Sequence, residues 1–92
     1  MITAIVLIDT EQAVIPEVAA QVADLDGVSE VYSVAGDCDL IAMVRVREHE
    51  DLADVIADRI SKVDGVVATR THLSFRAYSR HDLDAAFDLG NP

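Results

Sequence analysis

The triplet Asp-Gly-Val occurs twice in this sequence, at residues 26–28 and 64–66, and each copy follows an amphipathic run with helical spacing. After each copy comes an alternating run rich in valine, with threonines in the second. Glycine ends a helix readily because it adopts a left-handed conformation without a Cβ penalty, and β-branched valine favours an extended chain. The repeat therefore predicts two successive β-α-β units.

Four strands are expected, and their composition predicts their order in the sheet. Residues 2–8 and 40–46 are apolar on both alternating faces, as expected of central strands that are covered on both sides. Residues 29–35 and 68–76 carry charged and hydroxyl side chains, which is typical of edge strands. A right-handed β-α-β-β-α-β chain gives this arrangement. We therefore expect an α+β, ferredoxin-like fold with a four-stranded antiparallel sheet.

Two helices are expected, at residues 13–25 and 50–62, with Pro16 in the opening turn of the first. Both should pack on one face of the sheet, which leaves the apolar side chains of the other face without cover from the same chain. We expect a second copy of the chain to cover them in a homodimer. The inward stripes are Ile15, Val18, Ala19, Val22 and Leu25 in the first helix, and Leu52, Val55, Ile56 and Ile60 in the second.

Residues 1–78 are expected to form one ligand-binding and oligomerisation domain, and residues 79–92 a C-terminal tail. Ser79 is suited to cap a short helix that ends at Gly90, with Phe87 on an apolar face that docks, for example on a neighbouring subunit. The alternative for this segment is a frayed terminus.

The net charge of −10 excludes several classes of partner. Such a field repels phosphate backbones and anionic lipids, so direct binding to nucleic acid or membranes is not expected. The single Cys38 cannot form an internal disulfide, which fits a reducing cytoplasm. We see no signal peptide and no apolar run long enough to span a bilayer, and we expect a cytoplasmic protein.

The link between the second and third strands is Gly36-Asp37-Cys38-Asp39. Its simplest interpretation is a hairpin turn, because glycine and aspartate tolerate turn conformations. As a binding site, its exposed backbone N–H groups suit the carboxylate of an amino acid, and an aspartate suits the ammonium group.

Thr69 and Thr71 are two residues apart in the last strand, so their hydroxyls project from the same face. The simplest explanation is the high β-propensity of threonine. Their hydroxyls nevertheless suit a small zwitterion, because each can donate and accept a hydrogen bond.

Other candidates lack a specific pattern. His49, His72 and His81 show no metal-ligand spacing, and Cys38 between two acids is a poor thiolate. Nucleophile elbows, Walker loops and dinucleotide fingerprints are absent, so we expect no catalytic residue, metal or cofactor. A salt-bridged surface is favoured over an anion site for the scattered arginines, which are Arg45, Arg47, Arg70 and Arg76.

Two spaced patterns together resemble a known family, the effector-binding (RAM) domain of the Lrp/AsnC, or feast/famine, transcriptional regulators. The resemblance covers about residues 1–77. The patterns are Val31-x-x-Val34-x-Gly36-x-x-Asp39-Leu40-x-x-x-Val44 and, after the second helix, Gly65-Val66-x-x-Thr69-x-Thr71.

The resemblance implies a ferredoxin-like subunit that dimerises through its sheet face. Dimers in this family assemble into larger rings, often octamers, and bind small effectors, usually amino acids, in clefts between dimers. The turn and the last strand line these clefts. Carried over by position, the implied ligand-binding residues are Gly36, Asp37, Cys38, Asp39, Leu40, Thr69 and Thr71.

One departure from the family pattern concerns the N-terminus, because Met1 leads directly into the first strand where family members carry a helix-turn-helix domain. The resemblance therefore implies a stand-alone RAM protein that senses amino acids and co-assembles with full-length regulators. The expected function is indirect modulation of transcription, without enzyme activity.

Three alternatives remain open. An ACT domain shares the topology and binds amino acids, but residues 9–12 lack the glycine of its ligand turn. A small dimeric α/β-barrel enzyme, of the monooxygenase or isomerase type, needs polar groups under its helices, where this sequence places aliphatic residues. A purely structural assembly partner, with an empty ligand cleft, fits the same pattern.

Overall fold

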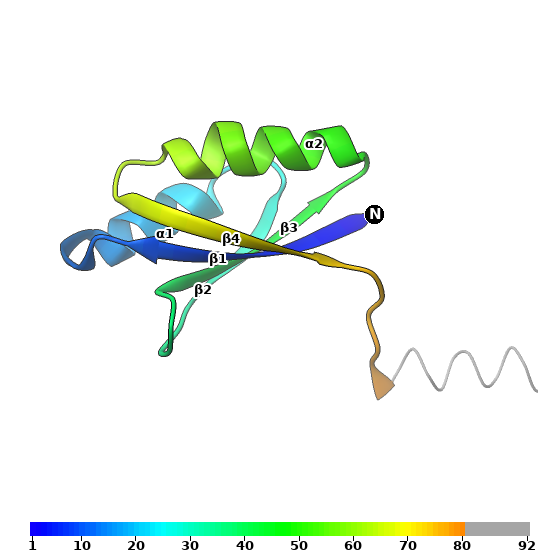
Figure 1. Ribbon diagram of the computed structural model, residues 1–92, viewed down its shortest axis with the longest axis horizontal. Helices are drawn as coiled ribbons and strands as arrows, with labels where there is room; N and C mark the ends of the chain where they lie inside the picture. Colours follow the sequence, from blue (N-terminus) through cyan, green and yellow to red (C-terminus); the bar gives the residue numbers. More distant parts are fainter. Residues whose placement is uncertain (81–92) are drawn as a thin grey trace, which may run out of the picture.

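The computed structural model describes residues 1–80, which form an antiparallel sheet with helices on one face (Figure 1). The strand order is β2-β3-β1-β4, so the first and third strands are central, and the predicted ferredoxin-like fold is confirmed. The elements are β1 (Ile2–Thr10), η1 (Gln12–Val14), α1 (Ile15–Ala23), β2 (Val28–Ser33), β3 (Leu40–Val46), α2 (His49–Ala53), η2 (Asp54–Arg59), η3 (Ile60–Lys62) and β4 (Val66–Ser74).

The core lies between the sheet and the helices. Residues that are directly paired across two strands point to the same face, and β1 and β3 pair Ile8 with Leu40 and Val6 with Ala42, all of which are fully buried. Both helices complete this layer with the apolar stripes expected from the sequence. Their buried residues are Val18, Val22, Val55 and Ile60.

The first helix starts later than expected and ends earlier. A 3₁₀ turn precedes it, and the α-helix begins only at Ile15 because Val14 has non-helical backbone angles, with φ −125° and ψ 20°. Pro16 follows in the first turn, as predicted, where its missing N–H costs no intrahelical hydrogen bond.

The second helix is regular for only five residues, α2, and then continues as the π-helical η2 and the 3₁₀ η3. Apolar spacing predicts the helical span but not this change in winding. At its far end, the hydroxyl of Ser61 donates a hydrogen bond to the carbonyl oxygen of Ile56 at 2.9 Å. A side chain that enters the backbone ladder in this way is a recognised cause of irregular winding.

The two Asp-Gly-Val triplets do mark the expected transitions. Gly27 and Gly65 have φ values of 92° and 97°, the left-handed region that glycine tolerates best. Each also lies in tight packing, because a Cβ on Gly27 would lie 2.7 Å from Val55 and one on Gly65 would lie 2.7 Å from Val14.

The sheet face away from the helices is partly exposed. On this face Ile41 of β3 pairs with Tyr32 of β2 on one side and with Leu7 of β1 on the other. Met43 of β3 also pairs with Ile5 of β1, and Tyr32 is 50% exposed. We call these five residues the open face.

Beyond β4 the chain leaves the sheet (Figure 1), and Phe75 is 96% exposed. The predicted tail helix, including Phe87 and Gly90, falls on residues 81–92, outside the described residues. None of the helices in residues 1–80 is both long enough and apolar enough to cross a membrane.

Candidate functional site

The Gly36–Asp39 turn is fastened to the end of β1 by Asp39. The backbone N–H of Asp39 donates to the carbonyl oxygen of Ile8 at 3.0 Å. Its side chain accepts two further hydrogen bonds, at 2.9 Å from the backbone N–H of Thr10 and at 3.3 Å from Nε2 of Gln12. Asp39 therefore holds the hairpin against the segment that enters the first helix.

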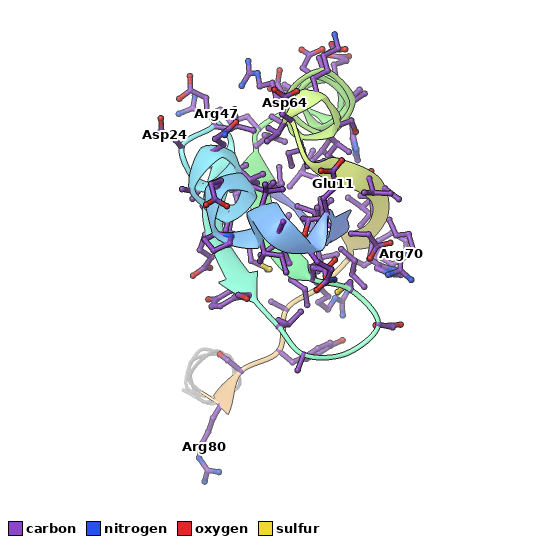
Figure 2. All side chains as sticks on the ribbon, turned by 90° about the vertical axis from the view of Figure 1, so that its left-hand side faces the viewer. Glu11, Asp24, Arg47, Asp64, Arg70 and Arg80 are labelled. Carbon is purple, nitrogen blue, oxygen red and sulfur yellow. The ribbon has the colours of Figure 1, made fainter. Side chains whose placement is uncertain are left out.

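Arg70 of β4 reaches the same turn from the other side. One of its guanidinium nitrogens, Nη2, donates to the carbonyl oxygen of Asp37 at 3.3 Å and lies 3.7 Å from Oδ1 of Asp9. Figure 2 shows Arg70 near the long loop between β2 and β3. The turn, the end of β1 and the start of β4 thus form one connected surface, which we call the turn site.

The two threonines of β4 lie on the opposite face of the strand from Arg70. Thr69 pairs with Ile8 and Thr71 with Val6, so both hydroxyls project toward the helix side of the sheet. Thr69 is half-buried and Thr71 is exposed. Since residues two apart in a strand are separated by about 7 Å, Thr71 lies one such step farther from the turn than Thr69.

The predicted residues inside the turn differ in what they offer to a ligand. Gly36 is exposed, and a Cβ built on it would meet no atom within 4 Å. Cys38 is only 6% exposed and Leu40 is fully buried, so their side chains belong to the core. Within one protomer, only the backbone groups of these two residues can meet a ligand.

Sequence reasoning missed two residues at this site. Arg70 was expected on a salt-bridged surface, and it makes that salt bridge with Asp9, but only the register of β4 places it beside the turn. Thr10 is the other: it is 6% exposed, and in residues 1–80 its Oγ1 is a buried oxygen without a hydrogen-bond partner. A buried hydroxyl without a partner calls for an explanation, such as a water or a ligand group.

The charges of the turn site favour a ligand that carries an amine. The carboxylate of Asp9 lies 3.7 Å from the guanidinium of Arg70, and Asp37 and Asp39 bring two further carboxylates to the turn. The exposed backbone at Gly36 adds groups that can pair with an anion. This combination suits a small zwitterion and contains no arrangement of nucleophile and base.

Comparison with known proteins decides the family. The family model described as the Lrp/AsnC ligand binding domain matches residues 3–83. The chain belongs to the Lrp/AsnC family. The resemblance inferred from the turn and the Thr-x-Thr strand is thereby confirmed.

Among curated relatives of this Lrp/AsnC chain, the HTH-type transcriptional regulator LrpA of Pyrococcus horikoshii is 39% identical over 59 residues, covering 64% of this chain and 42% of the relative. LrpA1 of Halobacterium salinarum is 39% identical over 72 residues, covering 78% of this chain and 49% of the relative. The chain thus spans less than half the length of these two regulators.

Solved structures agree with this assignment. TTHA0845 from Thermus thermophilus is 45% identical, with a TM-score of 0.81 over 87% of this chain and 100% of that one. A feast or famine regulatory protein from M. tuberculosis, solved in complex with L-methionine, is 28% identical, with a TM-score of 0.71 over 87% of this chain and 54% of that one.

Proposed function

We propose that this Lrp/AsnC domain is a regulatory sensor that binds an amino acid and responds through its assembly. The observation that carries the proposal is the family match over nearly the whole domain, together with a structural relative that holds L-methionine. The turn site supports it independently, since its carboxylates, its guanidinium and its exposed backbone complement the two charges of an amino acid.

In this proposal the turn and β4 bind the effector together. The backbone at Gly36 meets the carboxylate of the amino acid, and Asp37, whose side chain is exposed, meets the ammonium group. The hydroxyls of Thr69 and Thr71 supply the remaining polar contacts. Asp39 keeps the turn in place, and Cys38 and Leu40 contribute backbone only, because their side chains are buried.

The cleft is completed by other copies of the chain. The open face consists of apolar side chains that the helices do not cover, and we propose that two copies pair through it. Dimers then assemble into a larger ring, most simply an octamer, with the effector between dimers. A ligand held between subunits shifts the assembly equilibrium only to the extent that it binds one arrangement of subunits more tightly than another.

The domain acts on transcription indirectly, through full-length Lrp/AsnC regulators with which it co-assembles. Its net charge of −10 disfavours direct contact with DNA, whereas its relatives are named as transcriptional regulators. We place it in the cytoplasm, where the free thiol of Cys38 stays reduced.

The test is thermal unfolding in the presence of each amino acid, with the native mass followed in parallel. A ligand at about 100 times its Kd adds about 2.7 kcal/mol per site to the free energy of unfolding. A shift for one or two amino acids, with a change in oligomer mass, supports the proposal and names the effector. An intact oligomer that no amino acid stabilises contradicts it and favours a purely structural partner.

A further inference from the structure

A cavity of about 230 Å³ lies at the end of the sheet opposite to the turn site. The register fixes this position: Ile8 pairs with Leu40 next to the turn, whereas Ile2 pairs with Val46 beside the cavity. In Figure 1 the N-terminus and the loop between β2 and β3 lie at these two ends. The lining includes Gly27, Arg45, Arg47, Asp51, Asp54 and Arg59.

Three of the seven Lys and Arg residues of the chain line this one cavity, although the chain as a whole is strongly acidic. Arg45 is paired with Glu30 at 3.3 Å. Arg59 donates to the backbone carbonyl of Asp26 at 3.0 Å but has no carboxylate partner in the part of the chain that the structure describes. Arg47 has no ion pair there either. Two guanidinium groups are therefore available to an anion.

The wall of the cavity is an unusual piece of backbone. Asp54, Val55 and Arg59 belong to the π-helical η2. π-helical turns are rare and occur frequently at functional sites. Facing them is Gly27, where a Cβ would lie only 2.7 Å from Val55, so the loop after α1 packs closely against this helix. One side of the cavity is thus formed by closely packed backbone, whereas its charged side chains are exposed.

The lining also defines the ligand. Asp26, Asp51 and Asp54 line the same cavity as the two available guanidiniums, so a simple anion would meet repulsion as well as attraction. A molecule with one anionic and one amine group satisfies both signs. Because a water occupies about 30 Å³ of liquid, the volume suits a molecule of about eight non-hydrogen atoms.

We propose that this cavity is a second ligand site, which binds a small zwitterion with its anionic group on Arg47 and Arg59 and its ammonium group toward Asp51 and Asp54. The site is separate from the turn site, and Figure 2 shows Arg47 and Arg70 on opposite sides of the molecule. The inference does not depend on the proposed effector function.

The experiment titrates the full chain with two zwitterions, γ-aminobutyrate and phosphoethanolamine. Acetate and inorganic phosphate serve as probes with the anion only, and ethylamine as a probe with the amine only. Amide signals in NMR locate binding, and calorimetry measures affinity. We expect saturable shifts at Gly27 and Val46 with the zwitterions, and affinities at least about tenfold weaker for the singly charged probes.

Two variants make the test specific. Arg47→Ala should weaken zwitterion binding at least about tenfold, because it removes a charge-assisted hydrogen bond. Lys62→Ala is the control, since Lys62 is an exposed cation at the end of the second helix, 3.9 Å from Asp58, and lies outside the cavity. The affinity of Lys62→Ala for the zwitterions should equal that of the unchanged chain. Thr71→Val, in the proposed effector-binding strand, should also leave binding at the cavity intact.

Four results would overturn the inference. In NMR, these are the absence of saturable amide shifts at the cavity, or amide shifts at residues 36–39 in their place. In calorimetry, they are inorganic phosphate binding as tightly as phosphoethanolamine, or equal losses of zwitterion affinity in Arg47→Ala and Lys62→Ala. Thermal unfolding of each variant establishes that it is folded, which is expected because both side chains are exposed.

Discussion

The carboxylate of Asp39 accepts a hydrogen bond at 2.9 Å from the backbone N–H of Thr10, a residue 29 positions away in the sequence. This contact joins the β2–β3 turn to the exit of β1, where the chain bends toward its first helix. The aspartate of the turn motif therefore has a structural role in the protomer, whatever ligand the turn binds.

The first prediction concerns this contact. Asp39→Ala leaves the N–H of Thr10 buried without a partner, which should lower the free energy of unfolding by about 1–3 kcal/mol. Urea denaturation measures the loss. Asp37→Ala is the control, since its side chain makes no hydrogen bond or ion pair in residues 1–80, and we expect a change within about 0.5 kcal/mol. Equal stability of the two variants would contradict this role for Asp39.

The second prediction tests the ligand-binding role of β4. Thr71→Val keeps the shape of the side chain but removes its hydroxyl, so the affinity for the amino-acid effector should fall about fivefold while the fold is retained. Calorimetry gives the affinity. Ser74→Ala, on the opposite face of the same strand, should bind normally. An unchanged affinity in Thr71→Val would remove this residue from the site.

The third prediction addresses the open face. Ile41 lies in its middle, paired with Leu7 on one side and Tyr32 on the other. Ile41→Glu would place a charge in the proposed dimer interface, where desolvation is costly, so the native mass should fall to that of one protomer. Ala57→Glu adds the same charge to the exposed surface of the second helix and should leave the mass unchanged. If Ile41→Glu keeps its full mass, the subunits pair elsewhere.

The fourth prediction follows from a hydrogen bond at the edge of the sheet. The hydroxyl of Tyr32 donates to Glu30 at 2.6 Å, and Arg45 lies 3.3 Å from the same carboxylate. The bond from Tyr32, and then the one from Arg45, hold the pKa of Glu30 below its ordinary value. The bond to Glu30 raises the pKa of Tyr32.

These two pKa shifts make the stability of the domain depend on pH. Because the folded pKa of Glu30 is lowered, its contribution to stability is present above the ordinary glutamate pKa and is lost as pH falls through the lowered value. For Tyr32 the contribution is present below the ordinary tyrosine pKa and is lost as pH rises through the raised value. Tyr32→Phe should return the pKa of Glu30 toward its ordinary value in an NMR titration, whereas Tyr78→Phe should not.

The sequence predicted the elements that depend on local patterns. β3 begins and ends at the expected residues because an uninterrupted apolar run defines a buried strand. The helical stripes were predicted from apolar residues that recur every three or four positions. β4 begins two residues before its expected start and ends two before its expected end, because Val66 already pairs with Thr10 across a bulge that alternation does not reveal.

The sites depend on contacts between distant residues, and these were predicted less completely. The turn and the Thr-x-Thr strand are proposed as binding residues from their spacing, whereas Arg70 and Thr10 lie beside the turn only through the register of the sheet. The arginines around the cavity come from a strand end and from the second helix, so nothing in their sequence spacing indicates a common site. The π-helical winding of η2 also has no signal in apolar periodicity.

The two glycines of the repeat carry a consequence for how the domain folds. Gly27, which follows the helix of the first half, packs against Val55 in the helix of the second half. Gly65, which follows the second helix, packs against Val14 and Val18 around the first helix. Each half thus supplies the close-packing surface that the other requires. We therefore expect a fragment cut between β2 and β3 to remain unstructured until its complement is added, and the whole domain to melt as one cooperative unit.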